Sequence, residues 1–147
     1  MNWEEAHSVI ERLNKESYCG YSDWRLPTVH ELHSLIDYRQ LDPALLLDNP
    51  FNNVQLFWYW TSTIYVHEIG RVWIIYMCNG HVSHSNKSHN SCVWPVRSGQ
   101  CGGVLGNSTR FTDNNDGTVS DTKTGLMWTK DANIQKEYLP SRKRVAF

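Results

Sequence analysis

The dipeptide Asn79-Gly80 constrains the fold of this chain more than any other feature of its sequence. Asn-Gly suits the two central positions of a type I′ turn, whose backbone twist matches that of the strands it joins. Alternating runs flank the dipeptide, over residues 72–78 on one side and 81–86 on the other. The sequence therefore predicts an antiparallel β-hairpin centred on this turn.

Further strand-like segments lie on both sides of this hairpin. Residues 58–62 are aromatic and rich in β-forming side chains, and residues 93–97 form another such run. Pro95 places the second run at a sheet edge or a bulge, because proline has no N–H to donate. We therefore expect three or four strands within residues 57–97.

Two helices are predicted before these strands. Two segments, residues 2–14 and 29–37, have a cap residue at or just before their start, and Glu follows each cap three positions later, which is the capping-box spacing. The cap residues are Asn2 and Thr28, and apolar residues then recur at helical spacing along one face. Helices followed by strands that pair with one another indicate an α+β domain.

The composition limits the classes of function. The 147 residues suffice for one domain, and a hydrophobic content of 40% with seven Trp supports a core. The net charge of -1, from 14 basic and 15 acidic residues, argues against a nucleic-acid or membrane-surface binder. No apolar run approaches the ~20 residues that cross a bilayer, and the acidic, amphipathic first helix does not resemble a signal peptide. We expect neither a nucleic-acid partner nor membrane insertion.

The last third of the chain changes character. Residues 98–109 are Gly-rich and predict a flexible linker. Residues 110–129 predict a hairpin with an acidic turn, followed by a short strand. Residues 130–147 lose the apolar pattern, which predicts a loose tail. Residues 1–97 are left as the main domain.

Several separate segments resemble one known family. They are GYSDWRLPTVHELHSLIDY, YWTSTIY, VWPVRSGQ and RFTDNNDGTVSDTKTGLMWTKDAN. Over nearly all of residues 2–130 the chain resembles the domain of unknown function 1566, the C-terminal domain type of the Legionella collagen-like adhesin. The resemblance implies a C-type-lectin-like fold, with two helices packed on a small twisted antiparallel sheet and a loop-rich ligand face. It also implies a secreted or cell-surface bacterial protein, similar to sulfatase-modifying-factor-like domains and to the variable proteins of diversity-generating retroelements.

The order of these segments differs from the pattern of the family. In the family the part like FTDNNDGTVSD comes first, whereas here residues 110–129 follow the strand that normally ends the domain. The chain therefore resembles an excerpt from a tandem array, in which residues 1–97 lack their usual N-terminal strands. Residues 110–129 either complete the sheet within a monomer, as a circular permutation, or complete a second chain in a domain-swapped dimer. A linker of about eleven residues spans roughly 18 Å on average, which favours return within one chain.

The resemblance also indicates a ligand surface within residues 57–97. In retroelement-diversified relatives this region carries variable positions, and the side chains found here are ones that adenine-directed changes of an Asn codon produce. A repeat that is not diversified would carry a similar pattern. We expect this surface to bind a protein or a glycan. The candidate ligand-binding residues are Ile74, Tyr76, Cys78, His81, Ser83, His84, Ser85, His89, Ser91 and Cys92.

Metal binding is a further hypothesis for the histidines and acidic residues. The three histidines and two cysteines among the candidate residues offer zinc ligands, but their spacing matches no structural zinc pattern. The string D-N-N-D-G at residues 113–117 resembles part of a calcium loop, yet it lacks the closing Glu and equally suits a hairpin turn. We expect surface histidines and an acidic turn, with no metal or cofactor.

Catalysis finds little support in the sequence. We find no Ser-His-Asp arrangement, no paired carboxylates and no Gly-rich phosphate loop, so we expect a protein that is not an enzyme. Sulfatase-modifying relatives depend on reactive cysteines, and only Cys78 and Cys92 would suit that role here. These two cysteines are either bridged or free. His30 and His33 lie on the second predicted helix, where we expect exposed positions rather than ligands.

Overall fold

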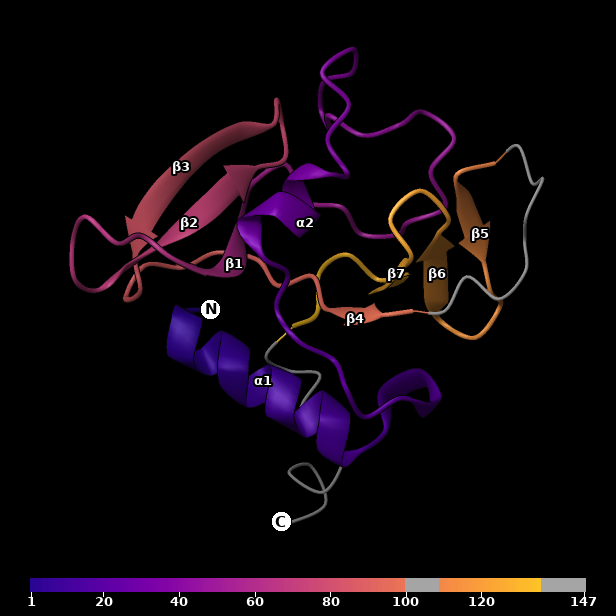
Figure 1. Ribbon diagram of the computed structural model, residues 1–147, viewed down its shortest axis with the longest axis horizontal. Helices are drawn as coiled ribbons and strands as arrows, with labels where there is room; N and C mark the ends of the chain where they lie inside the picture. Colours follow the sequence, from indigo (N-terminus) through magenta and orange to yellow (C-terminus); the bar gives the residue numbers. More distant parts are fainter. Residues whose placement is uncertain (100–108, 136–147) are drawn as a thin grey trace.

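The computed structural model describes residues 1–99 and 109–135 and has an α+β fold with two small antiparallel sheets (Figure 1). One sheet has the strand order β1-β2-β3, and the other has the order β4-β7-β6-β5. The helical elements are α1 (Trp3–Lys15), the short 3₁₀ turn η1 (Tyr18–Gly20) and α2 (Val29–His33). The strands are β1 (Trp58–Ile64), β2 (Arg71–Tyr76), β3 (His81–Asn86), β4 (Val96–Ser98), β5 (Phe111–Asp113), β6 (Thr118–Asp121) and β7 (Leu126–Thr129). The predicted α+β class is confirmed.

Both helices begin where their capping boxes predict. The Asn2 side chain accepts a hydrogen bond from the Glu5 N–H at 2.9 Å, and the Glu5 carboxylate accepts one from the Asn2 N–H at 2.9 Å. Thr28 and Glu31 make the same reciprocal pair at the start of α2. These bonds satisfy N–H groups that have no partner within the helix, so the local sequence alone fixes both starts.

The second helix ends at His33, whereas the sequence pattern predicts residues 29–37. The next bonds are shorter-range: the Leu35 N–H donates to the Leu32 carbonyl, and the Ile36 N–H donates to the His33 carbonyl. Ile36 then forms an antiparallel bridge with Leu45. The apolar spacing continues past His33, but pairing with a distant segment draws the chain out of the helix.

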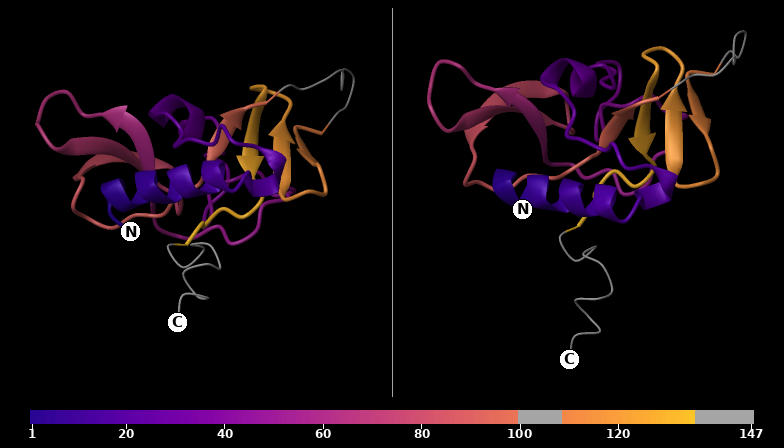
Figure 2. Two further views of the ribbon diagram at one scale, coloured as in Figure 1. Left: turned by 90° about the horizontal axis from the view of Figure 1, so that it is seen from below. Right: turned by 60° about the horizontal axis from the view of Figure 1, so that its bottom comes forward.

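Both faces of the first sheet contribute residues to the core, each against a different helix. Trp60 on one face joins a core cluster with Ile10 of α1. Ile75 on the other face joins a second cluster with Leu32 of α2. α1 runs along one side of the molecule, past both sheets (Figure 2). Because side chains alternate along β1 and β2, each strand contributes residues to two separate core clusters.

The hairpin forms as predicted, but its loop is longer than two residues. β2 and β3 pair without interruption up to Tyr76↔His81, which leaves Met77 to Gly80 in the loop. Met77 is fully buried, its N–H donates to the Phe57 carbonyl at 3.0 Å, and its carbonyl accepts from Ala44. Core packing therefore takes Met77 out of the β2–β3 ladder. Gly80 closes the loop with a φ of 81°, where a glycine avoids the strain of a side chain.

Residues 109–135 form most of the second sheet. β7 pairs with β4 through Val96↔Trp128, Arg97↔Met127 and Ser98↔Leu126. Ser98, which we predict as the start of the linker, is therefore the last residue of β4. The predicted strand over residues 93–97 begins only at Val96, beyond the proline.

A buried ion pair fastens this segment to the rest of the chain. Arg110 contacts both carboxylate oxygens of Asp121, at 3.0 and 2.8 Å, and also donates to the Ser34 carbonyl at 2.7 Å. The Asp121 side chain is fully buried. Because the Arg110 guanidinium bridges the second sheet and the end of α2, it sets their relative position.

Residues 130–135 differ from the prediction of a loose tail that starts at residue 130. Ala132 and Ile134 are buried, and the Ile134 N–H donates to the Val93 carbonyl at 3.1 Å. Asn52 and Asp131 form a parallel bridge. Two apolar residues that join the core clusters are enough to anchor this polar segment. The remainder of the predicted tail, residues 136–147, and most of the predicted linker, residues 100–108, lie outside the described residues.

Candidate ligand-binding site

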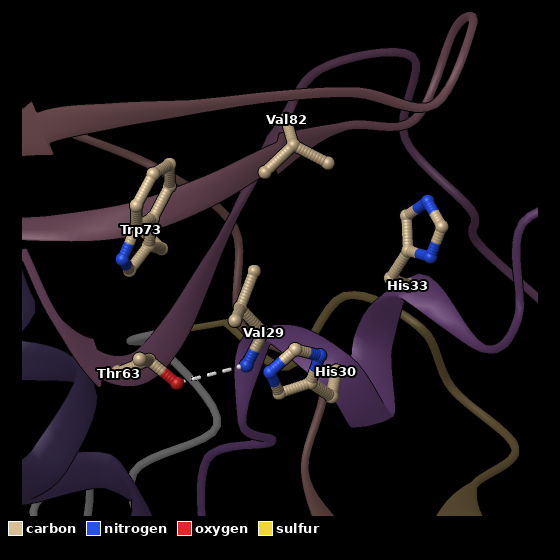
Figure 3. A pocket seen from close by; sticks show the side chains of 6 residues that line it. All are labelled: Val29, His30, His33, Thr63, Trp73 and Val82. Carbon is tan, nitrogen blue, oxygen red and sulfur yellow. Dashed lines mark hydrogen bonds between the residues drawn. The ribbon is translucent and has the colours of Figure 1, made fainter.

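A pocket lies between α2 and the face of the first sheet that packs on this helix (Figure 3). Its volume is about 480 Å³. α2 supplies one side of the pocket, and each strand of the sheet supplies one residue to the other side. The lining residues are Val29, His30, His33, Thr63, Trp73 and Val82.

The helix wall is positioned by the start of α2. The Val29 N–H, which has no partner within the helix, donates to the Thr63 hydroxyl of β1 at 2.9 Å (Figure 3). This bond fixes the first turn against the sheet. His33, one turn further on, has its Nε2 2.6 Å from the Tyr38 hydroxyl. The two bonds hold both ends of this short helix, so the helix wall is anchored despite its five residues.

Trp73 of β2 forms the aromatic wall of the pocket. Its indole is half-buried and meets Tyr65 edge-on, with 5.1 Å between ring centroids. Tyr65 in turn stacks on His84 at 3.8 Å. The Nε of Arg71 donates to His84 Nδ1 at 2.9 Å, so this nitrogen carries no proton in the bonded form. The stack restrains the indole and leaves part of its surface open to the pocket.

The lining is apolar apart from two histidines, one hydroxyl and the N–H of the Trp73 indole. It contains no Asp, Glu, Lys, Arg or Cys. An aromatic wall with a few polar groups is typical of sites that bind small molecules or single side chains. The same lining offers no nucleophile paired with a base and no carboxylate.

The predicted binding residues do not form one surface. Because side chains alternate along a strand, residues an even number apart share a face. The face that packs on α1 carries Ile74, Tyr76, His81, Ser83 and Ser85. His84 lies on the opposite face, next to Trp73. Ile74 is only 5% exposed and Ser85 only 8% exposed, which leaves them little surface to offer a ligand.

The remaining predicted residues lie away from the pocket. Cys78 is in the β2–β3 loop, and Ser91 is buried. His89 Nδ1 lies 2.9 Å from the Ser85 hydroxyl. The main chain of Cys92 forms a parallel β-bridge with Tyr59 of β1. None of these four candidates lines the pocket.

The cysteines that the structure describes are unpaired. Cys19, Cys78 and Cys92 are all free thiols, so the Cys78–Cys92 bridge is not formed, and Cys101 lies outside the described residues. Burial raises the pKa of the Cys92 thiol to about 11. A thiol with a raised pKa carries little of the reactive thiolate near neutral pH. This argues against a reactive role for Cys92.

The carboxylates in the acidic turn of the second sheet, residues 113–117, bond to neighbouring groups of the same chain. Asp113 accepts the Asn115 N–H at 2.9 Å and pairs with Lys130 at 2.7 Å, and this pair lowers the pKa of Asp113. Asp116 accepts the Thr118 N–H at 3.0 Å. The turn therefore has the hairpin role that its sequence suits. Within residues 1–99 and 109–135, no group of three or more His, Cys, Asp or Glu side chains is arranged to hold a metal ion.

The pocket residues are ones that sequence reasoning assigns to other roles. The sequence predicts His30 and His33 as exposed helix positions, and Trp73 and Val82 are not among its candidate ligand-binding residues. One signal does point to Trp73: a large aromatic side chain alternates with the buried Val72 and Ile74, so it faces away from α1. No local pattern shows that α2 stops short enough to leave this face open.

The fold and the pocket define a small α+β domain that presents an uncharged, aromatic-walled cavity on a rigid sheet. The chain belongs to the Lcl C-terminal domain family, whose model matches residues 1–97. This agrees with the resemblance to the C-terminal domain of the Legionella collagen-like adhesin, a family associated with collagen-like proteins of the bacterial surface. No curated protein and no solved structure matches the chain. In the part that the structure describes, no helix is long and apolar enough to span a membrane.

Proposed function

We propose that this chain is a recognition module of an adhesin, and that it binds an extracellular protein or glycan in the pocket between α2 and the first sheet. The observation that carries the proposal is the half-buried Trp73 indole, held by Tyr65 and open to a cavity of about 480 Å³. Rigid aromatic side chains give large contact area at a low cost in conformational entropy. Membership of an adhesin-associated family supports the same function.

The residues that line the pocket suit a ligand-binding site better than an active site. The two pocket histidines have no carboxylate beside them in the lining, so the orienting partner of a general base is missing there. Cys92, one of two candidates for a sulfatase-modifying type of chemistry, has a pKa raised to about 11 by burial and lies outside the pocket. We therefore propose a binding protein without enzymatic activity.

Substitution of two tryptophans that lie on opposite faces of the first sheet tests the proposed site. Trp73 faces the pocket, and Trp58 packs on Tyr76 on the other face, with 4.7 Å between ring centroids. The chain is applied to a glycan array and to an array of immobilised extracellular proteins. Trp73→Ala should weaken binding by about tenfold or more, as loss of an aromatic anchor does. Trp58→Ala, the matched control, should change it by less than about threefold.

The opposite result would assign binding to the other face. There Trp58, Tyr76 and His81 form an aromatic group, with Trp58 6.0 Å from His81 between centroids. Tyr76 and His81 are directly paired across β2 and β3. It contains Tyr76 and His81, two predicted ligand residues that keep exposed surface, so it is the second candidate site. Loss of binding in Trp58→Ala alone would contradict the pocket proposal.

The retroelement-diversified receptor-binding protein remains the alternative function. It predicts a near-copy of the coding region for residues 57–97, altered at adenines, beside a reverse-transcriptase gene. The accessible pair Tyr76 and His81 favours this alternative, whereas the buried Ile74 opposes it. The C-type-lectin-like fold is likewise a proposal, supported by two helices packed on small antiparallel sheets. An experimental structure superposed on that fold tests it.

A further inference from the structure

β3 forms an open edge of the first sheet. In the order β1-β2-β3, β3 has a single neighbour, and no other segment of residues 1–99 or 109–135 pairs with it. It runs for six residues in an unbroken register with β2. β3 lies at the outer side of this sheet in Figure 1. A regular edge of this length presents a row of main-chain groups to any strand that approaches.

The hydrogen-bond pattern identifies which main-chain groups point outward. The Lys87 N–H donates to the Gly70 carbonyl at 2.9 Å, just beyond the end of the ladder. Because bonded and non-bonded pairs alternate in an antiparallel ladder, every second residue back from Lys87 faces β2. The residues between them, Val82, His84 and Asn86, direct their N–H and carbonyl groups away from the sheet.

Most of these outward groups have no partner among the described residues. The Val82 N–H and carbonyl and the N–H groups of His84 and Asn86 make no hydrogen bond there. The His84 carbonyl accepts only a long bond of 3.4 Å from Arg71, and the Asn86 carbonyl accepts the His89 N–H at 3.0 Å. Three N–H donors and the Val82 carbonyl are therefore available at the spacing of an extended chain.

β3 itself lacks the residues that usually prevent strand addition, and the Arg71 guanidinium of β2 reaches its edge only at the His84 carbonyl. Proteins protect an edge with Lys or other charged side chains, with Pro, or with a bulge. The sequence of β3 is HVSHSN, which contains no Pro and no Asp, Glu, Lys or Arg. Its pairing with β2 shows no register shift. Lys87, the first charged residue after β3, is held over the Trp3 ring at 4.5 Å.

The open edge and the pocket are continuous at Val82. Its main chain points outward from β3, and its side chain lines the pocket. In an added antiparallel strand, the residue opposite Val82 would point to the same face of the sheet, about 5 Å further out. That face is the one covered by α2. Its side chain would enter the pocket beside Val82 and Trp73, where the lining favours an apolar group.

We propose that the ligand of this module is an extended peptide segment of a partner protein. Its main chain adds a fourth strand to the outer edge of β3, and one apolar side chain enters the pocket. Main-chain bonds then provide affinity and the pocket provides selectivity, as in other cases of strand addition. The inference rests on the proposed pocket function and specifies a peptide rather than a glycan.

Two substitutions at His84 distinguish the loss of a main-chain hydrogen bond from the loss of a side chain. His84→Pro removes an outward N–H that β2 does not use, and edge strands tolerate proline at such positions. His84→Ala removes the same side chain but keeps the N–H. The probe is a phage-displayed library of linear heptapeptides, selected on the wild-type chain. Both variants lose the imidazole that stacks on Tyr65, so the comparison is between them: selected peptides should bind His84→Pro about tenfold more weakly than they bind His84→Ala.

Two further measurements test the proposal without the proline variant, which matters if that variant does not fold. Synthetic copies of a selected peptide, N-methylated at alternate positions, should lose binding for one set of positions and keep it for the other. Bound peptide should also slow the exchange of the Val82, His84 and Asn86 amide hydrogens in the wild-type chain. Binding that survives both sets of methylation, or no slowing of these amides, would overturn the strand-addition proposal.

The failures of the two proposals are distinguishable. If no heptapeptide is enriched and a glycan binds in a manner that depends on Trp73, the pocket function holds and the peptide inference is wrong. If peptides bind the edge and Trp73→Ala leaves their affinity unchanged, the link between edge and pocket is wrong. If Trp73→Ala leaves the binding of every probe unchanged, both the pocket function and this inference fail.

Discussion

Trp94 and Trp128 meet edge-to-face in the core, with 5.4 Å between their ring centroids and both side chains fully buried. The Trp94 indole N–H also donates to the Thr129 carbonyl at 3.0 Å. Trp94 lies inside the part of the chain that the family model matches, and Trp128 lies outside it. Residues 109–135 are therefore part of the same core as the family-matched residues.

Removal of Trp128 should strongly destabilise the whole domain. Trp128→Ala leaves a large cavity next to Trp94, and buried aromatic truncations cost about 3–5 kcal/mol. The free energy of unfolding, measured by urea denaturation, should fall by that amount. Leu47→Ala is the control: this side chain is 78% exposed, so the change should stay within about 0.5 kcal/mol. A loss below about 1 kcal/mol for Trp128→Ala would contradict a shared core.

The local sequence predicts the starts of elements better than their ends. The capping boxes at Asn2 and Thr28 are complete within four residues, so both helix starts follow from the sequence. The end of α2 depends on Leu45, and the β2–β3 loop depends on contacts of Met77 with Phe57 and Ala44. Such long-range contacts leave no local pattern. The prediction for residues 130–135 is wrong for the same reason, because their two apolar residues are buried only through contacts with distant parts of the chain.

The site is less predictable than the fold, for a geometric reason. The predicted ligand surface treats residues 74–92 as one face, although alternation places Tyr76 and His84 on opposite sides of the sheet. The pocket takes its residues from a helix and three strands. Their proximity depends on how α2 crosses the sheet, which no spacing within one segment reveals.

The position of residues 109–135 leads to a prediction about oligomeric state. We expect the pairing of β7 with β4 to be made within one chain, because the intervening linker is long enough to allow it without strain. Size-exclusion chromatography with light scattering should then give the mass of a monomer, 17.1 kDa, at every concentration tested. A species that is only dimeric would instead support exchange of this segment between two chains.

The ion pair between Asp23 and Arg97 should make a small, pH-dependent contribution to stability. A hydrogen bond from Arg97 at 2.6 Å lowers the pKa of Asp23 below its usual 3.8. A lowered folded-state pKa gives stability that is present above the unfolded-state pKa and is lost as the pH falls through the folded-state pKa. The Asp23 side chain is 58% exposed, so solvent limits the contribution to less than about 1 kcal/mol.

The comparison of Asp23→Asn with wild type tests this contribution. The difference in free energy of unfolding should be measurable at pH 7 and should shrink towards zero as the pH falls through the lowered folded-state pKa of Asp23. Asp48→Asn is the control, because Asp48 is exposed and makes no ion pair with the described residues. A difference for Asp23→Asn that grows on acidification would show that the sign of the pKa shift is wrong.

Cys92 should be the slowest of the described cysteines to react with iodoacetamide in the folded protein. Burial raises its pKa from 9.0 to about 11, which lowers its thiolate fraction at pH 8 by roughly a hundredfold. Mass spectrometry of peptides after timed labelling should therefore find Cys92 modified much later than Cys78, and in denaturant the two rates should become similar. A Cys78–Cys92 disulfide would instead leave both cysteines unlabelled until a reductant is added. Rapid labelling of Cys92 in the folded chain would contradict its burial and would restore the case for a reactive cysteine.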